Sequence, residues 1–579
     1  MNNSKIFTGA DAVLKTLSDH GIDKVFWIPG WAALPIFDKL YENPYSIKYL
    51  PSKHEQWSAF KAQWVARSTG KVWAFFATSW PGATNTVTAI ADAYRDSIPI
   101  FGLTAQVQSH MMWLDAFQEI DIVDMVKKCT KYSKCVKNVD DIIKEVSKAI
   151  FIALDGRPWP VLIDIPKDVL LDEYKGEFEY KKDFKRSDFW LPPIWADKRK
   201  SFEISTEKMD EAISLLKWAS RPVLLVWQWI KFSWAQEELM NFINTLWIPT
   251  VPTALGKWVV KSKNKNNLKM LGMHGFVHTN KAVYNADLIM GIGLRFDDRI
   301  VGTYEEFWSK AKVIHVDIDQ KELGKIVSTN LSIRSDAKGF LSTFQDYYKW
   351  GKLNIDTWWK QIHDWDAADP YIVKNDVFWW KQVLKKINEI MDKKSVEDIV
   401  TVDVWQHQMW ATQIIDIDDP MNWLFSGWLW TMWCSLPFAL GAAVSNPNKQ
   451  VISISWDGGF QMNIQELWVL NEDEWLAENP NIKIMILDNS CLWMVRQWQE
   501  KFHDNRLSWV STRSPNFQKI GEGYNINSYT INNFDEMDQN LEKILSESWP
   551  ALIWFKIKTE DNVFPMVPPG KTLWEVITE

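Results

Sequence analysis

The fold is decided by residues 451–500, VISISWDGGFQMNIQELWVLNEDEWLAENPNIKIMILDNSCLWMVRQWQE. Two short apolar runs, 451–455 and 482–487, enclose a stretch of helical period that begins near Asn463. A strand, a crossover helix and a second strand are the unit of a parallel sheet. Asp457 and Asn489 follow the two strands, so both side chains reach the carboxyl edge of the sheet, where open α/β folds bind ligands.

A carboxylate, an amide oxygen and backbone carbonyls suit Mg²⁺, which takes phosphate oxygens for its remaining ligands. The pair Asp457-Gly458, followed about thirty residues later by an Asn, is similar to the diphosphate motif of thiamine-diphosphate enzymes. DGGFQMNIQEL and ILDNSCLWMVRQWQ resemble the acetolactate (acetohydroxyacid) synthase large-subunit family. The resemblance implies Mg²⁺ ligands at Asp457, Asn489 and the Cys491 carbonyl, and diphosphate contacts at Gly458 and Gly459.

Tryptophan stands at many positions throughout the chain where glycine is expected. There are 38 tryptophans but only 24 glycines, although average usage would give about 40 glycines. Many tryptophans stand in turns, where a residue without a Cβ atom is wanted. These are Trp27, Trp31, Trp80, Trp159, Trp227 and Trp229.

The resemblance places Trp456 and Trp493 at family glycines too, whereas Trp410, Trp423 and Trp498 match family tryptophans. We hypothesise that many of these tryptophans are glycine in the living protein, encoded by a UGA codon that the source organism reads as glycine. The alternative is a genuinely tryptophan-rich, degenerate sequence.

Length and composition indicate a soluble globular protein of several domains. The 579 residues are too many for one core and fit about three domains. The chain is 46% hydrophobic and 24% charged, with a net charge of -8. It has no basic stripe, so the sequence does not indicate a nucleic-acid-binding protein. The start of the chain has no signal peptide or membrane span. Four scattered cysteines predict neither disulfides nor a zinc site, so we expect a cytoplasmic protein with reduced thiols.

Residues 1–184 are predicted to form the pyrimidine-binding domain. VFWIPGWAALPI and HEQWSAFKAQWVARSTG, followed by TSWPGATN, resemble the family's segments in order and spacing. By this match Glu55 is the catalytic carboxyl group that protonates the aminopyrimidine ring, since burial beside an apolar ring favours a protonated acid. A lone Glu in a helical stretch is otherwise usually solvated. The implied thiamine-diphosphate contacts are Pro29, Gly30, Pro81 and Asn85.

The same domain supplies substrate residues by resemblance. LTAQVQSHMMWLDAFQEIDIV resembles the family's entrance segment, which implies Gln106 and Phe117 at the substrate entrance and Gln118 among the catalytic residues. IDIPKDV aligns Lys167 with a lysine near the cofactor. Core packing for Phe117 and a plain surface position for Lys167 are the competing interpretations.

A polar, Pro-containing linker is expected at 185–196, followed by a central domain at 197–346. RPVLLVWQWI, KMLGMHG, RFDDR and IHVDIDQKELGKI resemble the family's FAD-binding segments, and the flavin would be structural because the reaction has no redox step. The alternative is a domain that keeps the fold without its flavin. The implied FAD contacts are Gly272, Met273, His274, Arg295, Asp297, Arg299, Asp317 and Ile318.

After a helical connection at 347–371, residues 372–579 are predicted to form the diphosphate-binding domain. TVDVWQHQMWATQ and FSGWLWTMWCSLPFALGAA resemble the family with Trp405, Trp428, Trp430 and Trp433 at glycine positions. The tail NVFPMVPPGKTLWEVI resembles a segment that could fold over the site. The match implies thiamine-diphosphate contacts at Val404, Gln406, His407, Met432 and Met494, and an acceptor pocket shaped by Arg496 and Trp498.

The sequence thus predicts an α/β enzyme of three doubly wound parallel-sheet domains that joins two 2-oxo acids. The resemblance implies pyruvate as donor, with pyruvate or 2-oxobutyrate as acceptor, at the head of branched-chain amino acid synthesis. It also implies a homodimer or tetramer with the site at the subunit interface, and a possible small regulatory subunit.

The enzymatic rivals are pyruvate oxidase, glyoxylate carboligase and oxo-acid decarboxylases. Glyoxylate carboligase lacks the carboxyl group that Glu55 represents. The rival from another class is a non-catalytic relative whose indoles block the cofactor site.

Overall fold

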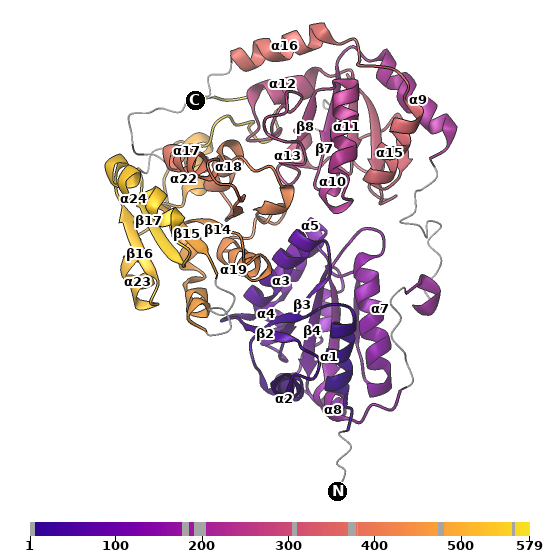
Figure 1. Ribbon diagram of the computed structural model, residues 1–579, viewed down its shortest axis with the longest axis vertical. Helices are drawn as coiled ribbons and strands as arrows, with labels where there is room; N and C mark the ends of the chain where they lie inside the picture. The colour runs from indigo at the N-terminus through magenta and orange to yellow at the C-terminus, as the bar shows by residue number, and fades with distance from the viewer. Residues whose placement is uncertain are drawn as a thin grey trace.

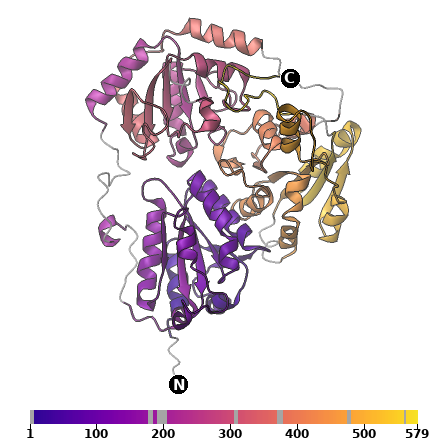
Figure 2. The same cartoon turned by 180° about the vertical axis from the view of Figure 1, so that it is seen from behind.

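The computed structural model describes residues 6–176, 184–189, 204–303, 310–368, 378, 380–472, 480–558 and 562–578. These residues form three parallel sheets, each flanked by helices, which lie at the bottom, top and left of Figure 1 in chain order. Figure 2 shows the same three units from behind. The predicted class, α/β with three doubly wound parallel sheets, is confirmed.

The N-terminal unit is a six-stranded sheet in the order β2-β1-β3-β4-β6-β5. Its strands are β1 (Lys24–Trp27), β2 (Lys48–Pro51), β3 (Trp73–Ala77), β4 (Ile100–Gln106), β5 (Tyr132–Cys135) and β6 (Val161–Pro166). Its α-helices are α1 (Gly9–Asp19), α2 (Leu34–Glu42), α3 (Glu55–Thr69), α4 (Gly82–Asn85), α5 (Val87–Asp96), α6 (Ile122–Val126), α7 (Ile142–Leu154) and α8 (Lys167–Leu171). Strands β4 and β6 are buried along their whole length, as expected for parallel strands covered on both faces.

The central unit is a five-stranded sheet in the order β11-β10-β9-β7-β8. Its strands are β7 (Pro222–Val226), β8 (Thr250–Pro252), β9 (Leu288–Ile292), β10 (Lys312–Asp317) and β11 (Leu331–Arg334). Its helices are α9 (Thr206–Trp218), α10 (Trp229–Phe232), α11 (Gln236–Leu246), α12 (Val277–Asn285), α13 (Asp298–Val301), α15 (Ala337–Tyr347) and α16 (Asp356–Ala367). Helix α16 lies beyond the predicted central range, yet Trp358, Trp359 and Ile362 are buried in the central core.

The C-terminal unit is a six-stranded sheet in the order β13-β12-β14-β15-β17-β16. Its strands are β12 (Ile399–Val402), β13 (Trp423–Leu424), β14 (Val451–Trp456), β15 (Ile482–Asp488), β16 (Asn527–Ile531) and β17 (Ala551–Lys556). Its α-helices are α17 (Trp380–Met391), α18 (Gln406–Ile414), α19 (Ser435–Ser445), α20 (Asp457–Gln461), α22 (Trp493–Phe502), α23 (Phe517–Gly523) and α24 (Phe534–Ser546). The predicted strands at 451–455 and 482–487 are confirmed, and they pair directly and in parallel.

The predicted crossover helix near Asn463 needs a correction. Residues Ile464–Asn471 form a 3₁₀ helix, η6, rather than an α-helix. Ile464, Leu467 and Leu470 are three residues apart, which matches three residues per turn. The short helix α20 precedes it, so Asp457 stands at a helix start directly after β14.

Two contacts between units position the site. Helix α3 packs on α19, with the rings of Phe60 and Phe438 at 5.5 Å and those of Trp57 and Trp433 at 6.4 Å. The C-terminal tail returns to the central unit, where Val567 N donates to Met273 O at 2.7 Å. In Figure 1 the end of the chain lies beside the central sheet.

The linker predicted at 185–196 falls mostly outside the described residues, which include a 3₁₀ turn at Arg186–Phe189. In the described part of the chain, no helix is long and apolar enough to cross a membrane. Cys129, Cys135, Cys434 and Cys491 are all free thiols, as predicted, although only Cys434 and Cys491 are fully buried.

Candidate active site

The carboxyl edge of the N-terminal sheet gathers the predicted catalytic carboxyl group and its neighbours. Glu55 is the first residue of α3, directly after the turn that follows β2, and it is half-buried. Asn85 Nδ2 donates to Glu55 Oε2 at 3.0 Å. A Cβ atom at Gly82 would lie 3.1 Å from Glu55 Oε1. The carboxylate is therefore held between an amide donor and a residue that must stay small, and we call these three residues the Glu55 cluster.

Two further predicted residues lie at the same edge. Ser79 Oγ donates to Gln118 Oε1 at 3.4 Å, and Gln118 has a positive φ of 63°. Lys167 begins α8 after β6, with its ammonium 3.6 Å from the centre of the Trp31 ring. Partial burial lowers the pKa of Lys167. Since strands β1, β2, β3 and β6 are parallel, their following loops bring these residues to one edge.

The two predicted entrance residues are not brought to one surface. Gln106 is buried and donates to Ile120 O at 2.6 Å and to Asp164 Oδ2 at 3.2 Å. Phe117 is 86% exposed, so its role as a plain core residue is excluded in this chain. Gln106 instead tethers the loop after β4.

The second group of predicted residues surrounds Asp457, at the carboxyl edge of the C-terminal sheet. Thr512 Oγ1 and Ser514 Oγ each donate to Asp457 Oδ2 at 3.1 Å, and Ser514 also donates to Asp488 Oδ1 at 2.8 Å. Burial, and then the nearby Asp488 carboxylate, raise the pKa of Asp457 to about 7. Within the described residues, Asp457 Oδ1 accepts no hydrogen bond.

These features fit a divalent cation with oxygen ligands. Asn489 is buried and directly follows β15, and the Cys491 carbonyl accepts a local hydrogen bond from Trp493 N at 3.0 Å. No group of three His, Cys, Asp or Glu side chains suited to a metal occurs in the described part of the chain. A site with one carboxylate, one amide and one carbonyl leaves the other positions to phosphate oxygens and water, as Mg²⁺ prefers.

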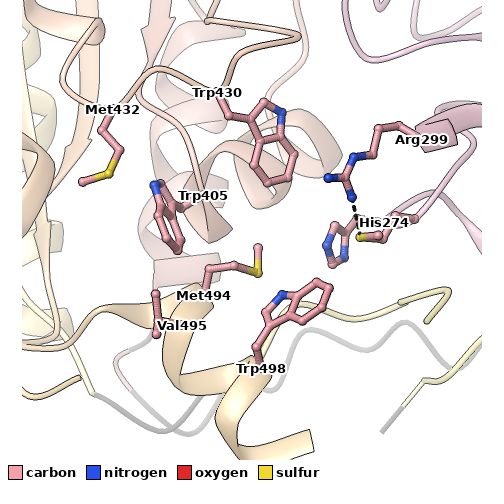
Figure 3. Close-up of a pocket in the computed structure, with 9 residues that line it drawn as sticks. His274, Arg299, Trp405, Trp430, Met432, Met494, Val495 and Trp498 are labelled. Atoms are coloured by element: carbon pink, nitrogen blue, oxygen red, sulfur yellow. Dashed lines mark hydrogen bonds between the residues drawn. The ribbon is translucent and has the colours of Figure 1, made fainter. Parts of the chain in front are cut away.

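A cavity of about 390 Å³ lies between the central and C-terminal units. Figure 3 shows Trp405, Trp430 and Met494 on one side, Arg299 and His274 on the other, and Trp498 closing the lower edge. Arg299 Nη1 donates to the sulfur of Met273 at 3.6 Å. Burial lowers the pKa of His274 to about 4, so this ring is neutral at physiological pH. The remaining lining residues are Met432 and Val495.

The cavity unites only part of the predicted thiamine-diphosphate contacts. Met432 and Met494 line it, as does Trp498 from the predicted acceptor pocket. Val404, Gln406 and His407 are fully buried, and Gln406 Nε2 bonds to Gln497 Oε1. Arg496 pairs with Glu500, Nε to Oε1 at 2.7 Å. The predicted contacts Pro29, Gly30 and Pro81 belong to the N-terminal edge, so the two halves of the predicted site do not meet in one chain's cavity.

The predicted FAD contacts also divide into two places. Met273, His274 and Arg299 line the cavity, while Arg295, Asp297 and Asp317 stand at the carboxyl edge of the central sheet. Gly272 has φ 103°, and a Cβ atom there would lie 2.3 Å from Arg299 O. Ile318 follows Asp317 directly and accepts from Arg334 Nε at 3.4 Å.

The backbone at several tryptophans has a conformation that favours glycine. In the described part of the chain, Trp113, Trp234, Trp247, Trp258, Trp405, Trp430, Trp433 and Trp509 all have positive φ, against a single Phe. Trp405 has φ 92° and ψ −152°, a region that is almost exclusive to glycine. Trp410, Trp423 and Trp498, which resemble family tryptophans, have ordinary backbone angles.

The indole of Trp456 occupies the diphosphate turn. A Cβ atom at Gly458 would lie 2.3 Å from Trp456 Cζ3, and one at Gly459 would lie 2.4 Å from Trp456 Nε1. The ring therefore covers the two glycines against which a diphosphate would pack. Trp229 lies equally close to Gly293 at the carboxyl edge of the central sheet, where a Cβ atom at Gly293 would lie 2.5 Å from Trp229 Cβ. With tryptophan at 456 and 229 these turns do not fit phosphate groups.

Several neighbours of these sites escaped the sequence analysis. Asp488 directly precedes Asn489 and could have been found from that adjacency. Thr512 and Ser514 lie in a polar stretch more than fifty residues beyond Asp457, and no local pattern links them to it. Asp403, whose Oδ2 lies 2.2 Å from the Cβ position of Gly459, has its pKa raised to about 7 by burial.

Comparison with known families matches each of the three units. The thiamine pyrophosphate enzyme N-terminal TPP binding domain matches residues 7–125, the central domain 209–344 and the C-terminal TPP binding domain 403–555. Each matched range contains one of the three sheets or most of it.

Curated relatives match over nearly the whole chain. The acetolactate synthase large subunit of Cyanidium caldarium is 38% identical over 98% of this chain and 96% of its own length. The isozyme 2 large subunit of Escherichia coli K12 is 35% identical over 98% and 99%. The chloroplastic acetolactate synthase 1 of Zea mays is 35% identical over 99% of this chain and 89% of its own length.

Proposed function

This chain belongs to the acetolactate synthase large-subunit family of thiamine-diphosphate enzymes. We propose that each active site is formed by two chains, one of which supplies the edge with Glu55 and the other the edge with Asp457. The chain is a thiamine-diphosphate-dependent enzyme that decarboxylates pyruvate and joins the remaining two-carbon unit to a second 2-oxo acid. With pyruvate as acceptor the product is 2-acetolactate. Use of 2-oxobutyrate as acceptor, and a small regulatory subunit, are parts of the proposal.

The observation that carries the proposal is the position of Glu55. Thiamine diphosphate, when bound, supplies a carbon nucleophile and an electron sink for decarboxylation. Glu55 would hold a proton at the far nitrogen of the aminopyrimidine ring, and Asn85 would fix the carboxyl group that does so. The cavity with Trp405, Met432 and Met494 lies between the other two units, and Glu55 is not among its lining residues.

The N-terminal edge has the surface of an interface. The loop that follows β4 exposes several large apolar side chains at this edge, which is characteristic of a protein contact. Three of them do not depend on the identity of any tryptophan, and their exposed fractions are Met111 38%, Leu114 71% and Phe117 86%. A second copy of this chain would cover them and bring its own diphosphate motif to Glu55, with Gln118 and Lys167 beside the substrate. A homodimer is then the minimum active unit, and a tetramer is compatible with it.

The metal and the flavin are assigned to the residues that the geometry favours. Asp457, Asn489 and the Cys491 carbonyl would hold Mg²⁺ against the diphosphate, with Gly458 and Gly459 as the turn below it. The segments at Gly272–His274, Arg295 and Asp317 would hold FAD in a structural role. FAD reduction by pyruvate would instead indicate an oxidase.

Both assignments require glycine in place of tryptophan at the crowded turns. We therefore propose that Trp229 and Trp456, and the tryptophans with positive φ, are glycine in the living protein. The first measurement is the mass of the peptide 451–466 from the source organism. Glycine at 456 opens the diphosphate turn; tryptophan there would leave a non-catalytic relative as the better assignment. The native form of the chain is the protein with the residues that the source organism incorporates at all of these positions.

A complementation experiment tests the two-chain site. Glu55→Gln and Asp457→Asn chains of the native form should each be inactive as homodimers. When they are mixed, unfolded and refolded together, half of the dimers carry one intact site, so about a quarter of the parental activity should return. The matched control mixes Glu55→Gln with Glu55→Gln/Asp457→Asn, which leaves every site defective. No recovery in the first mixture would show that each site is built from one chain.

A further inference from the structure

The loop between β13 and α19, residues 426–432, forms one wall of the cavity. Trp430 and Met432 line the cavity, and Trp430 has a positive φ of 51°. This segment, which we call the pocket loop, contains no regular secondary structure. Its shape must therefore be fixed by contacts with its surroundings.

Those contacts come from another domain. Helix α5 of the N-terminal unit presents Asp92 and Asp96, both fully buried, to the pocket loop. Asp96 accepts two backbone hydrogen bonds, from Gly427 N to Oδ2 at 2.9 Å and from Trp428 N to Oδ1 at 3.1 Å. One carboxylate thus satisfies two successive backbone donors. These bonds involve the main chain, so they form whichever side chain residue 428 carries.

Asp92 holds the other end of the loop. Its Oδ1 accepts from Ser426 Oγ and from Thr431 Oγ1, the latter at 3.1 Å. Ser426 Oγ in turn accepts from Thr431 N at 2.9 Å, which closes the loop on itself. The two carboxylates therefore hold four of the six residues that lead to Met432.

The charge of the pair is balanced only in part. Arg67 of α3 donates to Asp96 Oδ2 at 2.7 Å and lies 3.6 Å from Asp92 Oδ2, with its side chain almost fully buried. One guanidinium thus faces two carboxylates. Burial, followed by the charge of Asp96, raises the pKa of Asp92 to about 7. A buried charge is costly unless it is paired or hydrogen-bonded, and here both carboxylates accept hydrogen bonds from the pocket loop.

The end of α5 also touches the central unit. Gln228 Nε2 donates to Asp96 O at 2.7 Å, and Arg295 Nη1 donates to Arg95 O at 2.7 Å. The C-terminal end of α5 is therefore a junction of all three units beside the cavity.

We propose that Asp92 and Asp96 are positioning residues that hold the pocket loop, and with it the wall carrying residue 430 and Met432, in its binding-competent shape. The inference rests on the proposed function in taking the cavity as the cofactor site. The side chains themselves lie outside the cavity lining, so they act through the loop.

The decisive variant is Asp96→Asn in the native form. The two backbone N–H groups bond to different oxygens of Asp96, and the substitution replaces one of these oxygens with an NH2 group, which cannot accept a hydrogen bond. Hydrogen exchange of the amides of residues 427 and 428, measured without cofactor, should accelerate about ten- to hundredfold. The dissociation constant for thiamine diphosphate at saturating Mg²⁺ should rise by a similar factor, because the loop must then be ordered on binding.

Position 92 gives a graded series. Asp92→Asn keeps the acceptor for Ser426 and Thr431 and should stay close to the parent, whereas Asp92→Ala should resemble Asp96→Asn. If either aspartate variant fails to fold, Ser426→Ala/Thr431→Val removes the contacts of Asp92 from the loop side. Exchange should then accelerate at the amide of residue 431, which bonds to Ser426 Oγ in the parent.

The matched control is Glu322→Gln. Glu322 forms a buried ion pair with Arg157 between the N-terminal and central units, at 2.9 Å with both side chains 8% exposed. Its other ion pair is with Lys325, so in the described part of the chain its charged partners lie outside the pocket loop. It should leave loop exchange and cofactor affinity within about twofold of the parent. Equal loop exchange in Asp96→Asn and Glu322→Gln would overturn the proposal, since a general loss of stability would then explain both. A third outcome is that exchange accelerates in Asp96→Asn while the parent itself binds no thiamine diphosphate. That outcome would uphold the contact between the aspartates and the pocket loop and refute the proposed function.

Discussion

Asn85 and Gly82 contact the Glu55 carboxylate from two sides. The Asn85 side-chain amide donates to Glu55 Oε2 at 3.0 Å, and a Cβ atom at Gly82 would lie 3.1 Å from Glu55 Oε1. The Glu55 carboxylate is therefore oriented by the hydrogen bond from Asn85 and by the absence of a side chain at Gly82. Its function depends on that orientation, because proton transfer requires hydrogen-bond reach.

Gly82→Ala in the native form should therefore impair catalysis. The added methyl group also meets Thr78 Cγ2 at 2.8 Å, so the carboxylate must shift. We expect kcat to fall about ten- to hundredfold, with thiamine-diphosphate affinity changed much less. Gly351→Ala is the control, because a Cβ atom at Gly351 meets nothing within 4 Å. Equal kcat values for the two variants would rule out a positioning role for Gly82.

Trp405 and Trp410 offer a direct test of the backbone argument. In the chain with tryptophan at both positions, Trp405→Gly should raise the unfolding temperature, because it removes a strain of roughly 1–3 kcal/mol at φ 92°. Trp410→Gly should lower it, because Trp410 is fully buried and stacks on Trp380 at 3.2 Å; its loss costs about 3–5 kcal/mol. Thermal unfolding followed by circular dichroism distinguishes the two. A loss of stability in both variants would contradict the assignment of glycine to position 405.

The titration of Asp457 predicts the pH dependence of metal binding. Its pKa is raised from 3.8 to about 7, so the carboxyl group is protonated below that pH, and Mg²⁺ must displace the proton. Mg²⁺-dependent retention of thiamine diphosphate should therefore weaken by up to about tenfold per pH unit below about pH 7. Equilibrium dialysis of the native form between pH 8 and pH 5.5 measures this.

The same shift affects the chain without metal. Between pH 3.8 and about 7 the folded state binds a proton that the unfolded state releases, so this group's contribution to stability decreases as the pH rises through that window. Asp457→Asn should abolish both dependences. A pH-independent metal affinity in the parent would show that Asp457 is not the ligand.

A buried ion pair joins the N-terminal and C-terminal units. Lys61 Nζ and Glu466 Oε2 lie 2.7 Å apart with neither side chain exposed, and Glu466 Oε1 accepts from Lys53 N at 2.7 Å. Glu466→Leu should destabilise the chain by about 3–5 kcal/mol, because it leaves a buried ammonium without a counter-ion. Lys61→Met/Glu466→Leu should recover most of that loss in thermal unfolding, whereas an additive double variant would show that the pair does not interact.

The parallel-sheet class and the edges that carry Glu55 and Asp457 could be predicted because apolar runs followed by polar residues are local signals. The 3₁₀ geometry of η6 was missed because its apolar residues at 464, 467, 469 and 470 suit more than one helical period. The Asp92 and Asp96 contacts with the pocket loop link residues more than 330 positions apart. Such contacts are created by the packing of α3 on both α19 and α5, and no pattern within a single segment contains them.

The return of the tail to the central unit has a consequence for synthesis. Val567 and Leu573 are buried in the core that is otherwise built from residues 209–362, and Met566 pairs with Ile577 to close the segment. The central unit therefore cannot complete its core until residues 566–577 have been synthesised. Until then the nascent central unit exposes an apolar patch, so a chain truncated before Val567 should bind chaperones and be cleaved by proteases more readily than the longer chain.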